Sequence, residues 1–213
     1  MAVIVMKWRL TRMFKKALFS AALISFASAS TVLHAQEAKP YLFVSGGQSD
    51  ADVPKSDLDN FWGVGPGISS SLDTEDTAWK IGAGLKLNQY VAFEAEYIDL
   101  GEAAYSATDG IDIARTTLAT KGYGLNTVIT MPLDRFSLSA KAGYHRLETE
   151  ADFSFSGFDV MSESVEEWVL SWGLGAGFNL TEHFMVVAEF ERYRDVADEY
   201  DVDLMSAGLR YNF

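Results

Sequence analysis

Residues 78–100, which read AWKIGAGLKLNQYVAFEAEYIDL, decide the fold of this protein. In the first half of this stretch, apolar side chains such as Trp79 and Ile81 alternate with Lys80, Lys86 and small residues. Alternation with a period of two is typical of a β-strand that has one apolar face. The second half repeats the pattern after a short polar link, so the stretch predicts two adjacent antiparallel strands.

The same alternation recurs in six further segments, and the sequence therefore predicts eight strands. The first segment, PYLFVSGGQ, does not show which face is apolar, because Tyr41 and Phe43 alternate with Leu42 and Val44. After the N-terminal segment there is no run of apolar residues long enough for a transmembrane helix. The predicted strands lie at about 40–48, 78–87, 91–100, 122–131, 136–145, 168–180, 184–193 and 204–213.

The links between the predicted strands alternate between short and long. An antiparallel meander in which every second link is long places all the long loops at one end, as in outer-membrane barrels with short periplasmic turns. We therefore predict an all-β fold, an eight-stranded antiparallel up-and-down transmembrane β-barrel with both termini at the short-turn end. The short links are Asn88-Gln89, 132–135 and 181–183, and the long ones are about 50–77, 101–119, 149–166 and 195–201.

The apolar face of the predicted strands has the character of a membrane-facing surface. Thr127 is the only polar residue that we place on it in the membrane-crossing parts of the last seven strands. A soluble lipocalin-like barrel would instead bury its apolar face. Aromatic residues gather at both strand ends, as at the two interfaces of a membrane, and favour the membrane barrel. These are Trp79, Tyr97, Tyr123, Tyr144 and Trp168 near the long loops, and Phe93, Phe136, Phe178, Phe184, Tyr211 and Phe213 near the short turns.

Composition narrows the class of protein further. The 213 residues include 17 basic and 30 acidic side chains, a formal net charge of −13, and no cysteine. Nucleic-acid binding needs clustered Lys and Arg, so we expect no nucleic-acid partner. The lack of cysteine excludes disulfides, thiol catalysis and Cys-ligated zinc. We expect no other metal and no cofactor, because the acidic loops lack the ligand spacing and turn glycine of an EF-hand.

Residues 1–35 have the pattern of a secretory signal peptide. Five basic residues precede an apolar run at 17–27, which is too short to span a bilayer as a helix. We predict cleavage after Ala35, with Ala27-Ser28-Ala29 as a second candidate site. The alternative interpretation is an amphipathic N-terminal helix of a cytosolic protein. Cleavage would leave 12 basic and 30 acidic residues in the barrel domain, predicted at 36–213.

The inward face of the predicted strands carries balanced charges. Four basic and four acidic residues occupy it at mid-strand. Buried charges must pair, because desolvating an unpaired ion costs several kcal/mol. We expect Lys86 to lie diagonal to Glu94 across the first short turn, and Lys141 to cross the lumen to Glu94, Glu96 or Glu189. The predicted interior ion-pair network comprises Lys80, Lys86, Glu94, Glu96, Lys141, Glu189, Glu191 and Arg210.

Three segments carry a resemblance to a known family: FEAEYIDLG, PLDRFSLSAKAGYHRLE and the closing AEFERYRDVADEYDVDLMSAGLRYNF. They resemble the OmpA-like eight-stranded outer-membrane barrel domain over about 38–213. The resemblance implies that Leu209, Tyr211 and Phe213 form a C-terminal signal read by the barrel-assembly machinery, with periplasmic chaperones as further partners during biogenesis. Larger relatives continue into a peptidoglycan-binding domain, and we expect no such tether here.

The resemblance also bears on the interior charges. Members of the family have an interior ion-pair gate, and Glu94, the first glutamate of FEAEY, occupies the matching position. Lys141 and Glu189 are the candidate partners. The charges are then either a static network that specifies the fold or a gate that passes small ions.

We expect an integral protein of the cell outer membrane with a structural, envelope-integrity role and surface interactions through its long loops. The alternatives are a narrow, low-conductance porin-like channel gated by the ion pairs, and an adhesin. Expected partners are outer-membrane lipid and lipopolysaccharide, and we expect a monomer. We interpret the acidic loops as a solvated surface, and the alternative is that divalent cations bridge them to the phosphates of lipopolysaccharide. We expect no enzyme, because His145 has no serine two residues on and His183 lies in a short turn.

Overall fold

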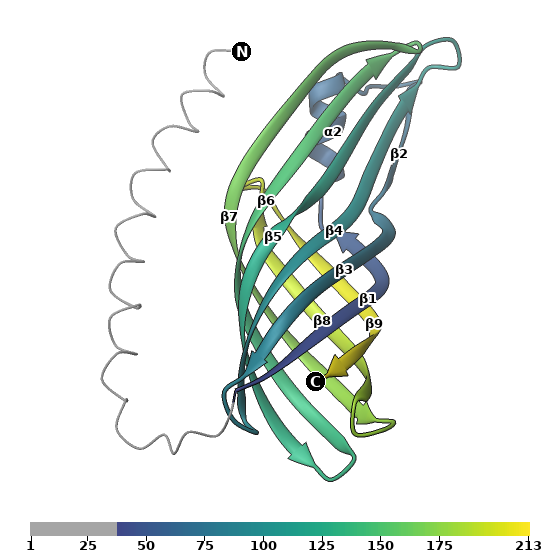
Figure 1. Ribbon diagram of the computed structural model, residues 1–213. Helices are drawn as coiled ribbons and strands as arrows, with labels where there is room; N and C mark the ends of the chain where they lie inside the picture. Colours follow the sequence, from purple (N-terminus) through teal and green to yellow (C-terminus); the bar gives the residue numbers. More distant parts are fainter. Residues whose placement is uncertain (1–37) are drawn as a thin grey trace. The chain divides into compact units, whose positions relative to one another are not determined.

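The computed structural model describes residues 38–213 as one antiparallel sheet of nine strands with one helix (Figure 1). The predicted signal peptide, 1–35, lies outside the described residues. No helix within 38–213 is long and apolar enough to cross a membrane. The elements are β1 (Lys39–Ala51), α2 (Lys55–Trp62), β2 (Ser69–Asp73), β3 (Glu75–Lys86), β4 (Val91–Thr108), β5 (Ile113–Leu133), β6 (Phe136–Phe155), β7 (Phe158–Asn179), β8 (Phe184–Val196) and β9 (Tyr200–Asn212).

Eight of the nine strands close into a ring. Their order is β4, β3, β1, β9, β8, β7, β6, β5, and β5 pairs with β4 to complete the circle. The first and last strands pair along their length, from Tyr41↔Asn212 to Ala51↔Val202. The predicted eight-stranded antiparallel up-and-down barrel is confirmed. The ninth strand, β2, lies outside the ring and pairs with β4.

The strands differ in length around the ring. β4, β5, β6 and β7 have 18 to 22 residues, whereas β1, β3, β8 and β9 have 12 or 13. A transmembrane strand needs only about 9–11 residues, so the four long strands extend far beyond the others at the long-loop end (Figure 1). Their extensions pair with one another and with β2. We call this part the upper sheet, residues 69–73, 102–108, 113–119, 150–155 and 158–164.

Two of the four predicted long loops are therefore mostly strand. The predicted loop 101–119 contains only the turn 109–112, and 149–166 contains only the two-residue turn Ser156-Gly157. The predicted loop 50–77 contains α2 and β2. These strands escaped prediction because a sheet outside the membrane, with water on one face and α2 on the other, does not need the apolar–polar alternation that marks a lipid-facing strand.

The burial of side chains confirms the predicted faces of the barrel strands. On β3, Trp79 and Ile81 are exposed on the outside of the barrel, whereas Lys80 is fully buried inside it. On β1, whose face the sequence left open, Leu42 is 51% exposed and Tyr41 is 0% exposed. The aliphatic residues of β1 thus face outward and its aromatic residues face the interior.

Two glycines of β3 explain the orientation of β1. Tyr41 pairs with Gly84, and Phe43 pairs with Gly82. A Cβ added at either glycine would collide with the ring of the opposite residue, so each missing side chain provides the space that an aromatic ring fills. The neighbouring strand, rather than the pattern within β1, decides which face turns inward.

α2 packs against the face of the upper sheet that continues the barrel interior. Leu58 and Trp62 contact a buried cluster around Tyr105 of β4. The indole Nε1 of Trp62 donates a hydrogen bond to Thr116 Oγ1 of β5 at 3.0 Å, and the Trp62 ring lies 6.5 Å from that of Phe153 on β6. The helix therefore ties three extended strands together, and the predicted loop 50–77 is an ordered part of the fold.

Candidate functional site

The middle of the barrel contains a network of buried ion pairs. The Nζ of Lys141 on β6 lies 2.9 Å from a carboxylate oxygen of Glu94 on β4, and 3.1 Å and 3.5 Å from those of Glu189 and Glu191 on β8. The Nζ of Lys80 on β3 lies 2.8 Å from Glu189 and also pairs with Glu191. Because β4, β6 and β8 are not neighbours in the ring, Lys141 joins carboxylates across the lumen.

Glu94 receives contacts from three other strands. Its Oε1 accepts a hydrogen bond from the hydroxyl of Tyr41 at 2.7 Å and one from Nη2 of Arg210 at 3.0 Å, and its Oε2 pairs with Lys141. The Arg210 guanidinium also lies 4.4 Å from the centroid of the Tyr41 ring, in cation–π contact. Glu94 thereby links β1, β4, β6 and β9 through one carboxylate.

Lys86 lies diagonal to Glu94 in the β3–β4 register, as predicted, but it does not pair with Glu94. Its Nζ donates a hydrogen bond to Oδ1 of Asn212 at 2.6 Å, and no ion pair within 38–213 includes it. The β3–β4 register is the predicted one, because Lys86 stands opposite Ala92 and Gly84 stands opposite Glu94, which leaves Lys86 diagonal to Glu94. The long side chain of Lys86 instead reaches the C-terminal end of β9.

His145 is the interior residue that the sequence analysis did not connect to the charges. Its Nε2 lies 3.0 Å from Glu96 Oε1, and its Nδ1 lies 3.2 Å from the hydroxyl of Ser171. The ring of Tyr193 packs edge-on against it, with centroids 5.1 Å apart. These four residues come from β4, β6, β7 and β8, and no local motif relates them. Of the eight predicted network residues, the structure thus joins six directly, places Glu96 beside His145 and places Lys86 apart.

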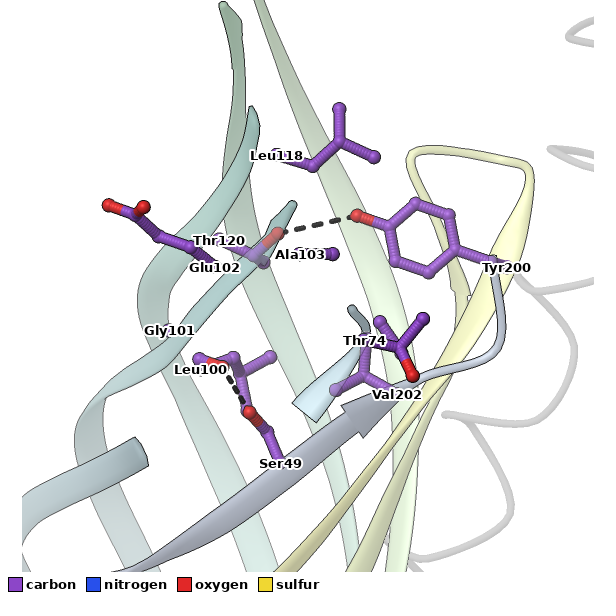
Figure 2. Close-up of a pocket in the computed structure, with 11 residues that line it drawn as sticks. Ser49, Thr74, Leu100, Gly101, Glu102, Ala103, Leu118, Thr120, Tyr200 and Val202 are labelled. Carbon is purple, nitrogen blue, oxygen red and sulfur yellow. Dashed lines mark hydrogen bonds between the residues drawn. The ribbon is translucent and has the colours of Figure 1, made fainter. Parts of the chain in front are cut away.

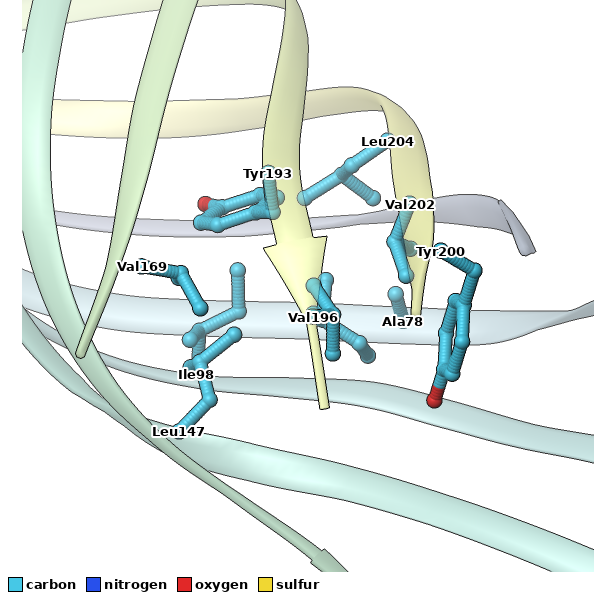
Figure 3. Close-up of a cluster of buried hydrophobic side chains, with 10 residues drawn as sticks. Ala78, Ile98, Leu147, Val169, Tyr193, Val196, Tyr200, Val202 and Leu204 are labelled. Carbon is cyan, nitrogen blue, oxygen red and sulfur yellow. The ribbon is translucent and has the colours of Figure 1, made fainter. Parts of the chain in front are cut away.

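An apolar cluster fills the barrel between the ion pairs and the upper sheet (Figure 3). Ile98, Leu147, Val169 and Leu204 each lie two residues beyond an inward-facing polar residue on their strands, and all are buried. The sequence analysis assigned the inward face to polar and small residues and missed this layer. Its members are Ala78, Ile98, Leu100, Leu147, Val169, Tyr193, Val196, Tyr200, Val202 and Leu204.

The cluster bears on the chemistry that the interior can perform. Ser171, His145 and Glu96 follow the serine–histidine–carboxylate order of a nucleophilic triad. All three are at most 4% exposed, and the apolar layer separates them from the long-loop end. A nucleophile needs a substrate carbonyl next to its hydroxyl, whereas the side chain of Ser171 is buried inside the barrel.

A small pocket lies on the long-loop side of the cluster (Figure 2). Ser49 Oγ donates a hydrogen bond to the carbonyl oxygen of Leu100 at 2.5 Å, and the hydroxyls of Thr120 and Tyr200 are 3.5 Å apart. The pocket wall therefore consists mainly of hydroxyls that are already bonded and of apolar side chains. Within 38–213 no group of three His, Cys, Asp or Glu side chains could hold a metal ion.

The predicted C-terminal signal lies at the short-turn end of β9. Leu209 and Phe213 are about half exposed or more on the outside of the barrel. The ring of Tyr211 packs between those of Phe184 and Phe213, at centroid distances of 5.1 Å and 5.0 Å. Tyr211 and Phe213 thus form part of the outward aromatic belt on this side.

Comparison with known proteins identifies the family. The model of the outer membrane protein beta-barrel domain matches residues 19–213. No curated protein matches the chain. Among solved structures, Ail, the attachment invasion locus protein of Yersinia pestis, in complex with the heparin analogue sucrose octasulfate, is similar with a TM-score of 0.53 and 17% identity, over 83% of this chain and 99% of Ail.

Two further structures are similar in fold. Neisserial surface protein A gives a TM-score of 0.54 with 14% identity, over 83% of this chain and 99% of the other. A major outer membrane protein from Thermus thermophilus gives 0.50 with 10% identity, over 83% and 100%. The family match spans the whole barrel, and the closed ring with its apolar exterior and aromatic belts fits a membrane-spanning barrel. The chain therefore belongs to the outer membrane protein β-barrel domain family, and it is an eight-stranded barrel of the cell outer membrane.

Proposed function

We propose that the protein is a structural component of the outer membrane whose barrel anchors the upper sheet at the cell surface, where it makes contacts with other molecules. The observation that carries this proposal is the difference in strand length, because β4–β7 extend well beyond the length needed to span the membrane. α2 supports the sheet from its inner face through Trp62. A rigid, supported sheet is a suitable platform for binding.

The charge of the upper sheet suggests what it contacts. Its five segments contain one basic residue, Arg115, and six acidic ones, which are Asp73, Glu102, Glu150, Asp152, Asp159 and Glu163. The related fold of Ail was solved with a sulfated heparin analogue, but an acidic surface repels sulfated ligands. We propose that, if the protein acts as an adhesin, its upper sheet binds cationic partners rather than sulfated ones.

A shortened variant tests the proposed function. Replacing residues 150–164 with Asn-Gly removes paired residues from β6 and β7 together and keeps the barrel register. In a strain lacking the protein, we expect this variant to restore resistance to detergent and to leave surface attachment at the level of the deletion. Wild-type protein serves as the control. If the deletion strain keeps full detergent resistance and full attachment, the proposal fails.

A narrow ion channel is the second candidate function. It is supported by Lys141, which lies within 3.5 Å of carboxylates from both sides of the lumen and could exchange partners. The apolar cluster above it opposes this function, because it fills the path. If the channel exists, wild-type protein in planar bilayers passes current and Glu94→Ala changes its single-channel conductance. If neither the wild-type protein nor Glu94→Ala passes current, the channel function is excluded and the structural function stands.

We further propose that the protein is not an enzyme. Burial of Ser171, His145 and Glu96 supports this. A fluorophosphonate probe, which labels activated serines, should label folded wild-type protein no more than Ser171→Ala. Labelling that disappears only in the variant would contradict the proposal.

We also propose that Leu209, Tyr211 and Phe213 form the signal read by the barrel-assembly machinery, with chaperones acting in the periplasm, and that the mature barrel is a monomer in contact with lipid and lipopolysaccharide. The outward position of Leu209 and Phe213 supports recognition of the unfolded C-terminus and later contact with lipid. Phe213→Ala should lower the amount of folded protein in outer-membrane fractions, with Leu133→Ala, an exposed residue at the same end, as the control. Equal amounts of both variants would contradict the assignment.

A further inference from the structure

Two lysines stand opposite each other at the short-turn end of the barrel. Lys39, the first residue of β1, is paired with Lys86, the last residue of β3. Lys39 lies two positions before the inward-facing Tyr41, and Lys86 lies two positions after Gly84, the partner of Tyr41. Because side chains alternate between the two faces of a strand, both lysines belong to the inward face. This end lies away from α2 and β2 (Figure 1), and in outer-membrane barrels the short turns face the periplasm.

Neither lysine has an acidic partner. Among residues 38–213, no ion pair includes Lys39 or Lys86. The Nζ of Lys86 donates its hydrogen bond to the neutral side chain of Asn212 and lies 5.5 Å from the centroid of the Tyr41 ring. Like charges directly opposite each other destabilise a sheet. The positive charges of the two lysines therefore stand uncompensated at the mouth of the barrel.

The lumen around the lysines offers no carboxylate to balance them. On the inward face of the described strands, the acidic residues nearest to the short turns are Glu94 and Glu189, and both already pair with Lys141. Asp134 and Glu182 are exposed in the turns themselves. Acidic residues outnumber basic ones by 30 to 17 in the whole chain, so this positive mouth runs against the overall charge. The inward polar residues between the ion-pair network and the turns are neutral: Thr130, Ser137, Ser139, Asn179 and Asn212.

Arg210 adds a third cation at the inner side of this mouth. Its guanidinium contacts the same Tyr41 ring as Lys86, at 4.4 Å from the centroid, and its Nη2 is bonded to Glu94. Arg210 is only 9% exposed, yet its Nε has no hydrogen-bond partner within 38–213. A buried donor without an acceptor is unfavourable. An anion in the mouth would supply the acceptor that this donor lacks.

The donors at the mouth favour a phosphate group over other anions. Lysine ammonium groups bind phosphate as point charges, and a guanidinium N–H adds a directed hydrogen bond. Inorganic phosphate or a phosphate monoester carries up to about two negative charges at neutral pH, which matches the two lysines. A carboxylate carries only one. The neighbouring hydroxyl and amide groups are further hydrogen-bond donors for phosphate oxygens.

We propose that Lys39 and Lys86 bind the phosphate group of a soluble periplasmic molecule at the short-turn mouth of the barrel. The bound phosphate offsets the repulsion between the two lysines and holds the start of β1 against the end of β3. The site lies at the other end of the barrel from the upper sheet, so it does not depend on the proposed surface function.

Calorimetric titration with inorganic phosphate tests the site. The protein is purified from outer-membrane fractions into dodecylmaltoside, a detergent without phosphate, in a buffer that contains no phosphate. We expect saturable binding. Acetate at the same ionic strength should bind at least tenfold more weakly, because it carries one charge. Absence of saturable phosphate binding, or equal affinity for acetate, would overturn the proposal.

Matched variants locate the site. Lys39→Gln with Lys86→Gln should weaken phosphate binding at least tenfold. Lys55→Gln with Lys121→Gln removes the same charge on α2 and on the long-loop half of β5, and should change the affinity less than twofold. Circular dichroism should show the same β-sheet signal for both double variants. An equal loss of affinity in both would indicate general attraction by charge and would overturn the assignment to the mouth.

A change of membrane mimic separates soluble phosphate from lipid phosphate. In nanodiscs of phosphatidylcholine, lipid headgroups that reach the site would compete with inorganic phosphate. We expect the wild-type protein to bind inorganic phosphate with equal affinity in nanodiscs and in dodecylmaltoside micelles. Weaker binding in nanodiscs would show that lipid headgroups occupy the site and would overturn the soluble source.

Discussion

At the scale of single residues, Glu94 is where the interior is most sensitive to substitution, since it accepts contacts from Tyr41, Arg210 and Lys141. We expect Glu94→Gln to lower the free energy of unfolding by about 3–5 kcal/mol, because it removes the carboxylate that pairs with Arg210 and one of the three that pair with Lys141. Lys86→Met, which removes only the bond to Asn212, should cost about 1.5 kcal/mol or less. Urea unfolding in detergent micelles, followed by tryptophan emission, measures both. Equal losses would show that Glu94 has no special place in the network.

Gly84 is the second sensitive position. The ring of Tyr41 occupies the space where a Cβ would stand, whereas at Gly46, on the outside of β1, nothing lies closer than 3.9 Å. We expect Gly84→Ala to destabilise the barrel by about 1–3 kcal/mol through overpacking, and Gly46→Ala to have little effect. The same unfolding titration compares them. A Tyr41→Ala background should remove the penalty at Gly84, and its persistence there would contradict this explanation.

Asp59 on α2 has an altered acidity. The hydrogen bond from Lys55, followed by those from Ser70 and Tyr105, lowers the pKa of Asp59 to about 2. A lowered pKa means that the ionised carboxylate holds α2 in place above pH 4 or so, and that this contribution is lost as the pH falls through about 2. Carboxyl NMR should show titration near pH 2 in wild-type protein and a higher value in Lys55→Ala. An unchanged value in that variant would exclude Lys55 as the cause, and Lys121→Ala is the control.

The sequence predicted the orientation of a residue correctly where the residue's neighbours in sequence determine it. It failed where the orientation depends on residues that are distant in the sequence. The outward face of β3 followed from its own alternation, and it was right. The orientation of Tyr41 depended on Gly84, which lies 43 positions away in the sequence. His145 was recognised as inward-facing, but its contact with Glu96 depends on the closure of the ring, which no spacing in the sequence encodes.

At the scale of elements, α2 is the part whose order depends most on one side chain. Trp62 connects the helix to β5 and β6. Burying a large apolar side chain stabilises by roughly 1.5–3 kcal/mol, so Trp62→Ala should increase local opening of α2 about tenfold or more. Trypsin cleavage after Lys55 in nanodisc-embedded protein measures this opening. Ile111→Ala, at an 89% exposed position, should leave the rate unchanged, and an unchanged rate in Trp62→Ala would mean that the helix is held by other contacts.

The elements that the sequence failed to predict share one property. The eight barrel strands face lipid on one side, and their alternation revealed them. The upper halves of β4–β7 and the strand β2 face water and the helix, so polar residues such as those of 149–154 occupy strand positions without a lipid-facing pattern. The apolar cluster inside the barrel was missed because the sequence analysis assigned the whole inward face to polar and small residues. Near the long-loop end that face carries apolar residues instead.

At the scale of the whole molecule, closure of the ring through β1 and β9 predicts resistance to SDS. Every membrane-spanning strand has two neighbours, so no edge is open to detergent within the barrel. We expect the unheated protein from outer-membrane fractions to migrate as a compact species and to shift on boiling. Glu94→Gln should lower the temperature of this shift. A protein that migrates identically before and after boiling would contradict a closed barrel.

The tight turn between β6 and β7 limits which insertions and deletions this hairpin can accept during evolution. Ser156 and Gly157 both have positive φ values, 48° and 83°, as the two-residue turns that match strand twist require. A two-residue turn cannot absorb an extra residue. The hairpin therefore keeps its strand register only when both strands gain or lose the same number of residues. Among homologous chains, insertions and deletions in this hairpin should therefore come mostly in even numbers. An odd change must be absorbed as a bulge, and Val160, which has no partner on β6, is what one such event would leave behind.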